Sequence, residues 1–311
     1  MAQYNMDKLY EAVEKKGHVC AGLDTAPSYI PPAERRRAAS DSGAVLAFNK
    51  AIIDAVLDAA ACFKVQIACY EELGLAGLKA YAETLRYIRD RGGLVIADIK
   101  RGDIADTASR YAAAHFSGDF EADFVTLSPY MGMDSIEPWL SWAGSAGKGA
   151  FVLMRTSNRG MKDFEYLELA AEGAAAEGAD TKTGRRGRRL YEAVGEKLSA
   201  LAAVKKGKYG YGAFGAVVGC TERDEAAFIR ETYGGLFFLI PGYGAQGGAA
   251  DDAALLLREG NGGVVNASRS ILRAWTETCE DPEEAGNGFA AEAARSAVLN
   301  MRDAVRAAVK V

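Results

Sequence analysis

The chain alternates between short apolar runs and longer segments with helical periodicity. Apolar runs rich in β-branched and aromatic residues predict eight strands, at 18–24, 61–71, 93–100, 124–130, 149–158, 214–221, 236–243 and 262–271. Between them, segments such as LGLAGLKAYAETLRYIRD repeat apolar positions every three or four residues, as amphipathic helices do. Strand and helix alternating about eight times indicate an α/β protein and favour a (β/α)₈ barrel over an open sheet.

The length of 311 residues fits one large α/β domain or two small ones. We expect residues 1–311 to form a single barrel domain with insertions near 25–45 and 158–200. The second insertion contains the basic run RRGRR at 185–189. This run predicts a solvated face or a tight turn, because a nucleic-acid surface needs more charge and interleaved aromatic residues.

Composition narrows the class of protein. The net charge of −5 argues against broad affinity for nucleic acid, which requires clustered Lys and Arg. Five cysteines without a C-x-x-C motif are typical of reduced thiols in a cytoplasmic protein, and two histidines make a His-rich metal site improbable. No apolar stretch is long enough to span a membrane, and the N-terminus does not resemble a signal peptide. We therefore expect a soluble cytoplasmic protein without nucleic-acid or membrane partners.

Polar side chains stand repeatedly at the C-terminal ends of the predicted strands. Catalytic groups of (β/α)₈ barrels lie on the loops at this end, so these side chains should converge on one mouth. The residues concerned are Asp24, Lys64, Asp98, Lys100, Ser157 and Arg269.

The densest group of charges lies in ADIKRGDIADT, residues 97–107. Asp98 and Lys100 are two residues apart on a strand and therefore share one face. Buried charges are tolerated only when they are paired. Two lysines, Lys64 and Lys100, could therefore alternate with two aspartates, Asp98 and Asp103. Asp103 and Thr107 are four apart, which fits the first turn of a following helix. A structural ion-pair network is the alternative to an active site.

A glycine-rich loop follows the seventh predicted strand, with Gly242, Gly244 and Gly247 in the pattern G-x-G-x-x-G. Its backbone amides and a following helix N-terminus suit a phosphate, and Arg269 would add a bidentate cation. The next strand ends without the acid that a dinucleotide site needs, so a phosphate monoester fits better. A tight turn without a ligand is the alternative.

Taken together, these residues resemble the orotidine 5′-monophosphate decarboxylase family. Its motif D-x-K-x-x-D-I-x-x-T is present from Asp98 to Thr107, and GLD, FKV, TSN, PGYGAQGG and SRSI occur in order. The similarity spans residues from about 18 to 271, and the insertions with TSN look most like the larger bacterial branch. Ser268 departs from the glycine that many members carry before the phosphate arginine, but its backbone amide can still donate.

The resemblance implies decarboxylation of orotidine 5′-monophosphate to UMP, the last step of de novo pyrimidine biosynthesis, without a cofactor or a metal. Lys100 would stabilise the carbanion at C6 and protonate it. A homodimer is implied, with Asp103 and Thr107 reaching toward the neighbouring site. The other implied contacts are Asp24 and Lys64 to the ribose, Ser157 to the pyrimidine, and the phosphate to Gln246, Arg269, Gly242 and Ser268.

Two other functions share parts of this pattern. Sugar-phosphate decarboxylases and aldolases of the same superfamily use the D-x-K-x-x-D acids to hold Mg²⁺, but a metal site would favour a carboxylate where Lys64 stands. A nucleotide-binding barrel without catalysis is the other. A dinucleotide oxidoreductase is a weaker alternative, because the glycine motif follows the seventh strand.

Overall fold

Eight parallel strands close into a barrel in the computed structural model, which describes residues 4–170, 187–244 and 247–309. The barrel order is β1-β10-β9-β8-β5-β4-β3-β2, and β1 pairs with both β10 and β2. The predicted (β/α)₈ fold is therefore confirmed. The barrel strands are β1 (Val19–Gly22), β2 (Cys62–Gln66), β3 (Val95–Arg101), β4 (Phe124–Leu127), β5 (Gly149–Arg155), β8 (Phe214–Val218), β9 (Phe238–Ile240) and β10 (Gly263–Ala267).

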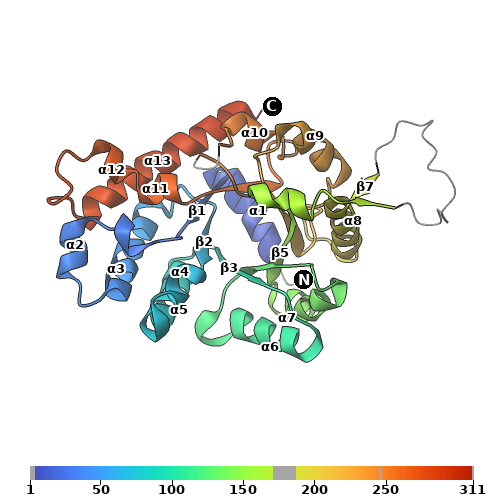
Figure 1. Ribbon diagram of the computed structural model, residues 1–311, viewed down its shortest axis with the longest axis horizontal. Helices are drawn as coiled ribbons and strands as arrows, with labels where there is room; N and C mark the ends of the chain where they lie inside the picture. The colour runs from blue at the N-terminus through green and yellow to red at the C-terminus, as the bar shows by residue number, and fades with distance from the viewer. Residues whose placement is uncertain (1–3, 171–186, 245–246, 310–311) are drawn as a thin grey trace.

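Helices follow the barrel strands and surround them (Figure 1). The long helix α13 (Asn287–Ala308), which comes after β10, packs beside α3 (Asp41–Val56), which follows β1, and α10 (Ala250–Ala254), which follows β9. This packing completes the ring of helices. The helices are α1 (Asn5–Lys16), α2 (Pro32–Arg37), α3 (Asp41–Val56), α4 (Ala68–Glu71), α5 (Gly74–Asp90), α6 (Ala105–Phe116), α7 (Leu140–Ala146), α8 (Leu190–Ala203), α9 (Arg223–Thr232), α10 (Ala250–Ala254), α11 (Arg269–Leu272), α12 (Trp275–Thr278) and α13 (Asn287–Ala308).

Several predicted strands were too long at their C-terminal ends. The run 61–71 is a strand only as far as Gln66, and its last four residues form α4. The run 262–271 ends as a strand at Ala267, and Arg269 begins α11. Apolar composition continues past these strand ends because the following turns still pack against the barrel, so periodicity alone does not show where pairing stops.

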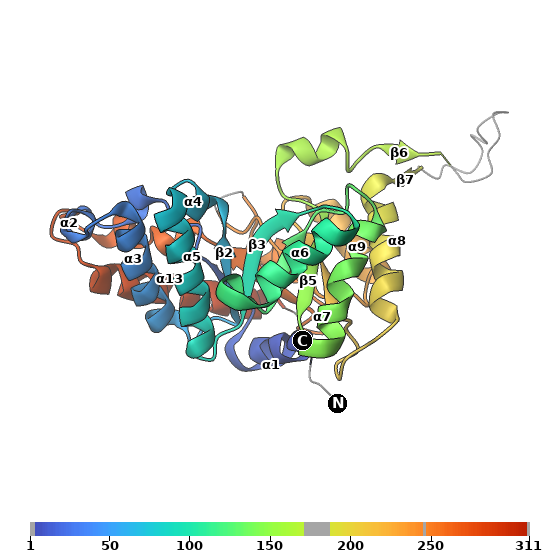
Figure 2. The same ribbon diagram turned by 90° about the horizontal axis from the view of Figure 1, so that it is seen from below.

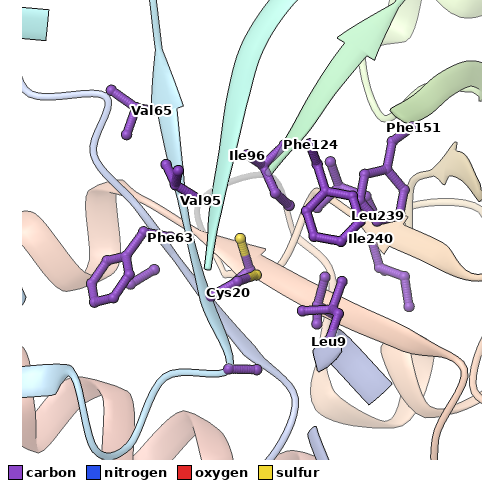
Figure 3. Close-up of a cluster of buried hydrophobic side chains, with 14 of the residues drawn as sticks. Leu9, Cys20, Phe63, Val65, Val95, Ile96, Phe124, Phe151, Leu239 and Ile240 are labelled. Carbon is purple, nitrogen blue, oxygen red and sulfur yellow. The ribbon is translucent and has the colours of Figure 1, made fainter. Parts of the chain in front are cut away.

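Helix α1 covers the N-terminal end of the barrel. The backbone N–H of Asn5 donates to the carbonyl of Gly147 (2.8 Å), and its side chain donates to the Asp123 carboxylate (3.2 Å), just before β5 and β4. Leu9 projects from α1 into the barrel core (Figure 3), where the tilted rings of Phe124 and Phe151 pack with centroids 5.5 Å apart. This end is filled with apolar side chains, which leaves the opposite end for polar groups.

The insertion 158–200 begins as an arm that leaves the barrel after β5. It contains a 3₁₀ helix (Arg159–Asp163) and a short antiparallel ladder of β6 (Glu168–Leu169) with β7 (Arg188–Arg189). Figure 2 shows this ladder on the side of the barrel away from α1. Residues 171–186 lie outside the described residues, and with them part of RRGRR. Arg189 corrects the prediction of a solvated face, because it binds Glu225 and its guanidinium lies 4.1 Å from the ring centroid of Tyr166.

The first insertion, near 25–45, forms a 3₁₀ turn (Pro27–Tyr29), α2 and the start of α3. Trp275 of α12 donates from its indole N–H to the Tyr29 carbonyl (2.9 Å), so the insertion is attached to the C-terminal helices. Among the described helices, none combines the length and apolar character needed to cross a membrane.

Candidate active site

A cavity of about 600 Å³ opens at the C-terminal ends of the strands. Polar residues from seven of the eight barrel strands and the loops that follow them line it, as the sequence predicted for one mouth. The predicted residues that line it are Asp24, Lys64, Asp98, Lys100, Ser157, Gly242, Ser268 and Arg269.

Asp98 lies at the centre of the site and is 5% exposed. Its Oδ1 accepts from Lys100 Nζ (2.6 Å) and from the Thr126 hydroxyl (2.8 Å). Its Oδ2 accepts from Lys64 Nζ (2.9 Å) and from Gln66 Nε2 (3.0 Å). A carboxylate offers about four lone-pair positions, so these four donors saturate it.

Asp24 extends these contacts into a row of alternating charges. Lys64 Nζ lies 2.9 Å from Asp24 Oδ1 and 2.9 Å from Asp98 Oδ2. We call Asp24, Lys64, Asp98 and Lys100 the charge array. Within one chain Asp24 supplies the second aspartate of this row, and the predicted role of Asp103 in a neighbouring site stays a prediction. Closure of the barrel explains the position of Asp24, since β1 pairs with β2 and places Gly22 beside Lys64.

The charge array fixes the ionisation of its buried members. Burial alone would lower the pKa of Lys64, but the carboxylates of Asp24 and Asp98 outweigh it and hold that pKa above its usual value. Burial alone would raise the pKa of Asp98, and the ammonium groups of Lys64 and Lys100 instead hold it well below its usual range. Both groups are therefore charged at neutral pH.

Lys100 has a backbone conformation that is rare for a residue with a side chain, with φ at 45°. The register of β3 with β4 shifts between Ala97 and Arg101, as a β-bulge does. Thr126 holds this bulge, because its hydroxyl accepts from the backbone N–H groups of Ile99 and Lys100 at 3.0 Å each. The strained backbone aims the Lys100 side chain, which is 47% exposed, over Asp98.

Sequence reasoning missed Thr126 and Gln66. Gln66 follows Lys64 by two residues on β2, and that spacing already placed both side chains on one face. Thr126 is a lone hydroxyl in an apolar strand, and only the pairing of β4 with β3 shows which neighbours it meets.

Asp103 and Thr107 do not line the cavity of their own chain. Asp103 precedes α6, and its carboxylate accepts from the backbone N–H of Ile104 (2.8 Å). Thr107 lies on the exposed side of the first turn of α6. The predicted placement of both residues on one helix is therefore wrong for Asp103, because the helix begins at Ala105.

The described residues of the glycine-rich loop, 242–244 and 247–248, have the backbone conformations of tight turns. Gly242, Gly244 and Gly247 all have positive φ, and Gly244, Gly247 and Gly248 donate their amides to carbonyls of the loop itself. The following helix α10 has five residues, and the Asp252 carboxylate accepts from the backbone N–H of Ala249 at its start (2.9 Å). The Asp252 side chain therefore satisfies one backbone N–H at the start of α10, and the contribution of this helix N-terminus to phosphate binding stays a prediction.

Arg269 and Ser268 stand beside this loop at the end of β10. Among the described residues, the Arg269 guanidinium makes no side-chain hydrogen bond, and it lines the cavity. The Ser268 hydroxyl donates to Asp24 Oδ2 (2.9 Å) over Gly22, where a Cβ would lie 2.0 Å from the serine oxygen. Gln246 lies outside the described residues.

The donor set suits an anionic ligand better than a metal ion. Within the described part of the chain, no group of three or more His, Cys, Asp or Glu side chains is arranged to hold a metal. The two cavity acids of the charge array, Asp24 and Asp98, already accept from lysine. A divalent cation would have to displace an ammonium group from each of them.

Comparison with known proteins relates this site to one family. Residues 17–286 match the model of the family described as orotidine 5′-phosphate decarboxylase / HUMPS. An orotidine 5′-phosphate decarboxylase of Clostridium perfringens (strain 13 / Type A) is 52% identical over 303 residues, which cover 97% of this chain and 98% of the relative. One of Clostridium tetani is 51% identical over 304 residues, covering 98% of each.

Solved structures agree with this relationship. The UMP synthase of Leishmania donovani superposes with a TM-score of 0.74 at 32% identity, covering 98% of this chain and 57% of that one. A structure described as a putative orotidine 5′-phosphate decarboxylase from Streptomyces avermitilis superposes with a TM-score of 0.76 at 29% identity, covering 99% and 96%.

Thr126→Val should destabilise the protein by about 3 kcal/mol, because it keeps the shape but leaves two backbone N–H groups and Asp98 without their hydroxyl partner. Thr126→Ser keeps the hydroxyl and serves as the control. Urea unfolding of the two variants measures the difference. Equal stability of the valine and serine variants would show that the hydroxyl does not hold the bulge.

Proposed function

The chain belongs to the orotidine 5′-phosphate decarboxylase / HUMPS family and decarboxylates orotidine 5′-phosphate to UMP, and we propose that its charge array carries out this step with Lys100 as the proton donor. The observation that carries the proposal is the position of Lys100. Its ammonium lies 2.6 Å from Asp98 at the cavity wall and stays half exposed to a ligand.

The reaction needs a positive charge beside C6 of the pyrimidine. The bond between C6 and the carboxylate carbon breaks, CO₂ leaves, and the electron pair stays on C6 in the plane of the ring. The ring cannot delocalise that pair, so a fixed ammonium must stabilise it in advance. Lys100 then transfers a proton from Nζ to C6, which gives UMP, and the neutral amine regains a proton from water.

Asp98 would orient Lys100, because its Oδ1 accepts from the Lys100 ammonium at 2.6 Å. All four of its acceptor positions are occupied, so it holds Lys100 from a fixed point. The substrate carboxylate would lie beside it and be repelled. Loss of that carboxylate as CO₂ relieves the repulsion as the reaction proceeds.

The remaining residues would hold the rest of the nucleotide. Asp24 and Lys64, which pair with each other at one end of the charge array, would bind the ribose hydroxyls. Arg269, free of other side-chain bonds in the described structure, would bind the phosphate together with Ser268 and Gly242, which line the same cavity. By the family resemblance, Gln246 would also contact the phosphate. Ser157, on the far side of the cavity after β5, would contact the pyrimidine ring.

We further propose a homodimer in which Asp103 and Thr107 act in the partner's site. Asp103 does not line its own cavity, and it precedes Ile104, one of several exposed apolar residues on neighbouring loops. Ile104 is 47% exposed, Tyr130 82% and Met131 48%, on the adjoining loops after β3 and β4. Backbone bonding joins those loops, because Ser128 N–H donates to the Arg101 carbonyl (2.8 Å). Exposed apolar groups of this kind favour burial against a second copy.

Replacing Lys100 by alanine should lower kcat more than about a thousandfold, because the variant loses both the fixed charge and the proton donor. Binding of UMP should remain measurable by calorimetry, since the lost role belongs mainly to the transition state. Lys79→Ala, an exposed lysine on α5, is the control. A Lys100→Ala enzyme that keeps more than about a tenth of kcat would rule out this assignment.

Treatment with EDTA should leave turnover unchanged, because the lysines supply the positive charge that a metal ion would otherwise provide. The measurement is the loss of absorbance of orotidine 5′-phosphate after incubation with the chelator. Activity that is lost and then restored by Mg²⁺ would support the sugar-phosphate branch of the superfamily. Tight binding of UMP without any turnover would support a non-catalytic barrel.

Mixing inactive Lys100→Ala with inactive Asp103→Ala should restore activity. A mixed dimer has one site with both lesions and one site with none. Random exchange makes about half of the dimers mixed, so turnover should approach roughly a quarter of the wild-type value. Native mass spectrometry of differently tagged chains shows whether subunits exchange. If they do and turnover stays at the level of the separate variants, Asp103 does not act across an interface.

A further inference from the structure

Glu165 lies outside the barrel, on the arm, yet both of its carboxylate oxygens contact the cavity wall. Its Oε2 accepts from the backbone N–H of Thr156 (2.9 Å), and its Oε1 accepts from the Thr156 hydroxyl (2.8 Å). The same hydroxyl lies 2.7 Å from Oδ1 of Asn158. Thr156, Ser157 and Asn158 all line the cavity. The carboxylate therefore fastens the segment 156–158, which begins directly after β5.

The arm fixes the position of Glu165 in turn. Its backbone carbonyl accepts from the N–H of Tyr191 (3.1 Å) at the start of α8. The next residue, Tyr166, donates its hydroxyl to Glu225 of α9 (2.6 Å) and lies under the guanidinium of Arg189. Two helices outside the barrel thus hold the acid in place.

Ser157, in the middle of the fastened segment, has little room to move. A Cβ at Gly219 would lie 2.7 Å from the Ser157 Cβ, and one at Gly242 would lie 3.2 Å from it. The Thr221 hydroxyl donates to the Ser157 carbonyl (3.3 Å). Gly219 and Gly242 therefore leave just enough space for the Ser157 side chain on one side. On the other side, the hydrogen bonds of Thr156 to Glu165 hold the segment.

The contacts to Thr156 also account for an acid in this position. Burial raises the pKa of Glu165, against the hydrogen bonds from Thr156 and the charge of the fully buried Arg155. A half-buried carboxyl group is unfavourable unless it is hydrogen-bonded. A side chain that only filled space here would be better served by an apolar residue.

We propose that Glu165 is a positioning residue that holds the segment 156–158 so that Ser157 contacts the pyrimidine ring. The inference rests on the proposed function, which assigns the pyrimidine to Ser157. We expect Glu165 to act mainly at the base, because it binds Thr156 directly after β5, whereas Arg269, which would bind the phosphate, stands at the end of β10 with β8 and β9 between them. The arm outside the barrel would thereby change affinity for the base more than affinity for the phosphate.

Two substitutions of similar size separate hydrogen bonding from packing. Glu165→Leu fills the space but accepts no hydrogen bond, and we expect it to raise the KM for orotidine 5′-phosphate and the Kd for UMP about tenfold. Its kcat should change by less than about threefold, as expected for an interaction made equally in the ground and transition states. Glu165→Gln should restore near wild-type values, because its amide can accept from the Thr156 N–H and donate to the hydroxyl.

Ribose 5-phosphate, which lacks the pyrimidine, tests where Glu165 acts. Its inhibition constant should be the same for the wild type, Glu165→Leu and the control Asp163→Ala, an exposed acid two residues earlier on the arm. The double variant Thr156→Val with Glu165→Leu should bind UMP no more weakly than the more affected of the two single variants. Both substitutions remove the same contact, between the Thr156 hydroxyl and the Glu165 carboxylate.

Equal losses for UMP and ribose 5-phosphate, or leucine and glutamine variants that behave alike, would overturn the positioning role. Turnover of the wild type decides the proposed function separately. A wild type that shows this binding pattern without turnover would refute the proposed function and support the role of Glu165. A wild type that does not bind UMP would refute both.

Discussion

The saturated carboxylate of Asp98 is the interaction on which the mouth of the barrel depends. Its four donors come from three neighbouring strands: Lys64 and Gln66 from β2, Lys100 from β3 and Thr126 from β4. An unpaired charge at 5% exposure would be strongly destabilising, so the register of these strands and the ionisation of the site are determined together. The same contacts that allow a buried charge also place two ammonium groups at fixed points around a cavity.

The bulge in β3 changes the direction of the chain between Lys100, which lines the cavity, and Asp103, which does not. A regular strand would carry Arg101 and the residues after it straight on along the barrel wall. The positive φ at Lys100, held by the Thr126 hydroxyl, aims the lysine over Asp98 and directs the chain outward toward Asp103. Asp103 consequently lies outside the cavity, next to exposed Ile104, although it is only three residues from Lys100 of the charge array. The crowding of charges in ADIKRGDIADT follows from this change of direction.

Local pattern was enough to predict the barrel and most of the site, and insufficient where contacts depend on distant pairing. The two-residue period placed Asp98 and Lys100 on one face, and strand ends identified Asp24, Lys64 and Arg269 as residues of one mouth. Pairing of Asp24 with Lys64 was not predicted, because it depends on β1 closing the barrel beside β2. Glu165 gave no periodic signal at all, since its contacts to Thr156 arise from an irregular turn nine residues further along.

The two lysines that share Asp98 differ in what they can do. Lys64 is 5% exposed, and its ammonium lies 2.9 Å from each of two carboxylates, which hold it in place. Lys100 is bound by one carboxylate oxygen and its side chain is 47% exposed. A proton donor must reach the reacting carbon and then be reprotonated after each turnover, which requires access to both ligand and solvent. This difference in burial supports the proposal that Lys100 donates the proton, with Lys64 as the fixed charge that keeps Asp98 ionised.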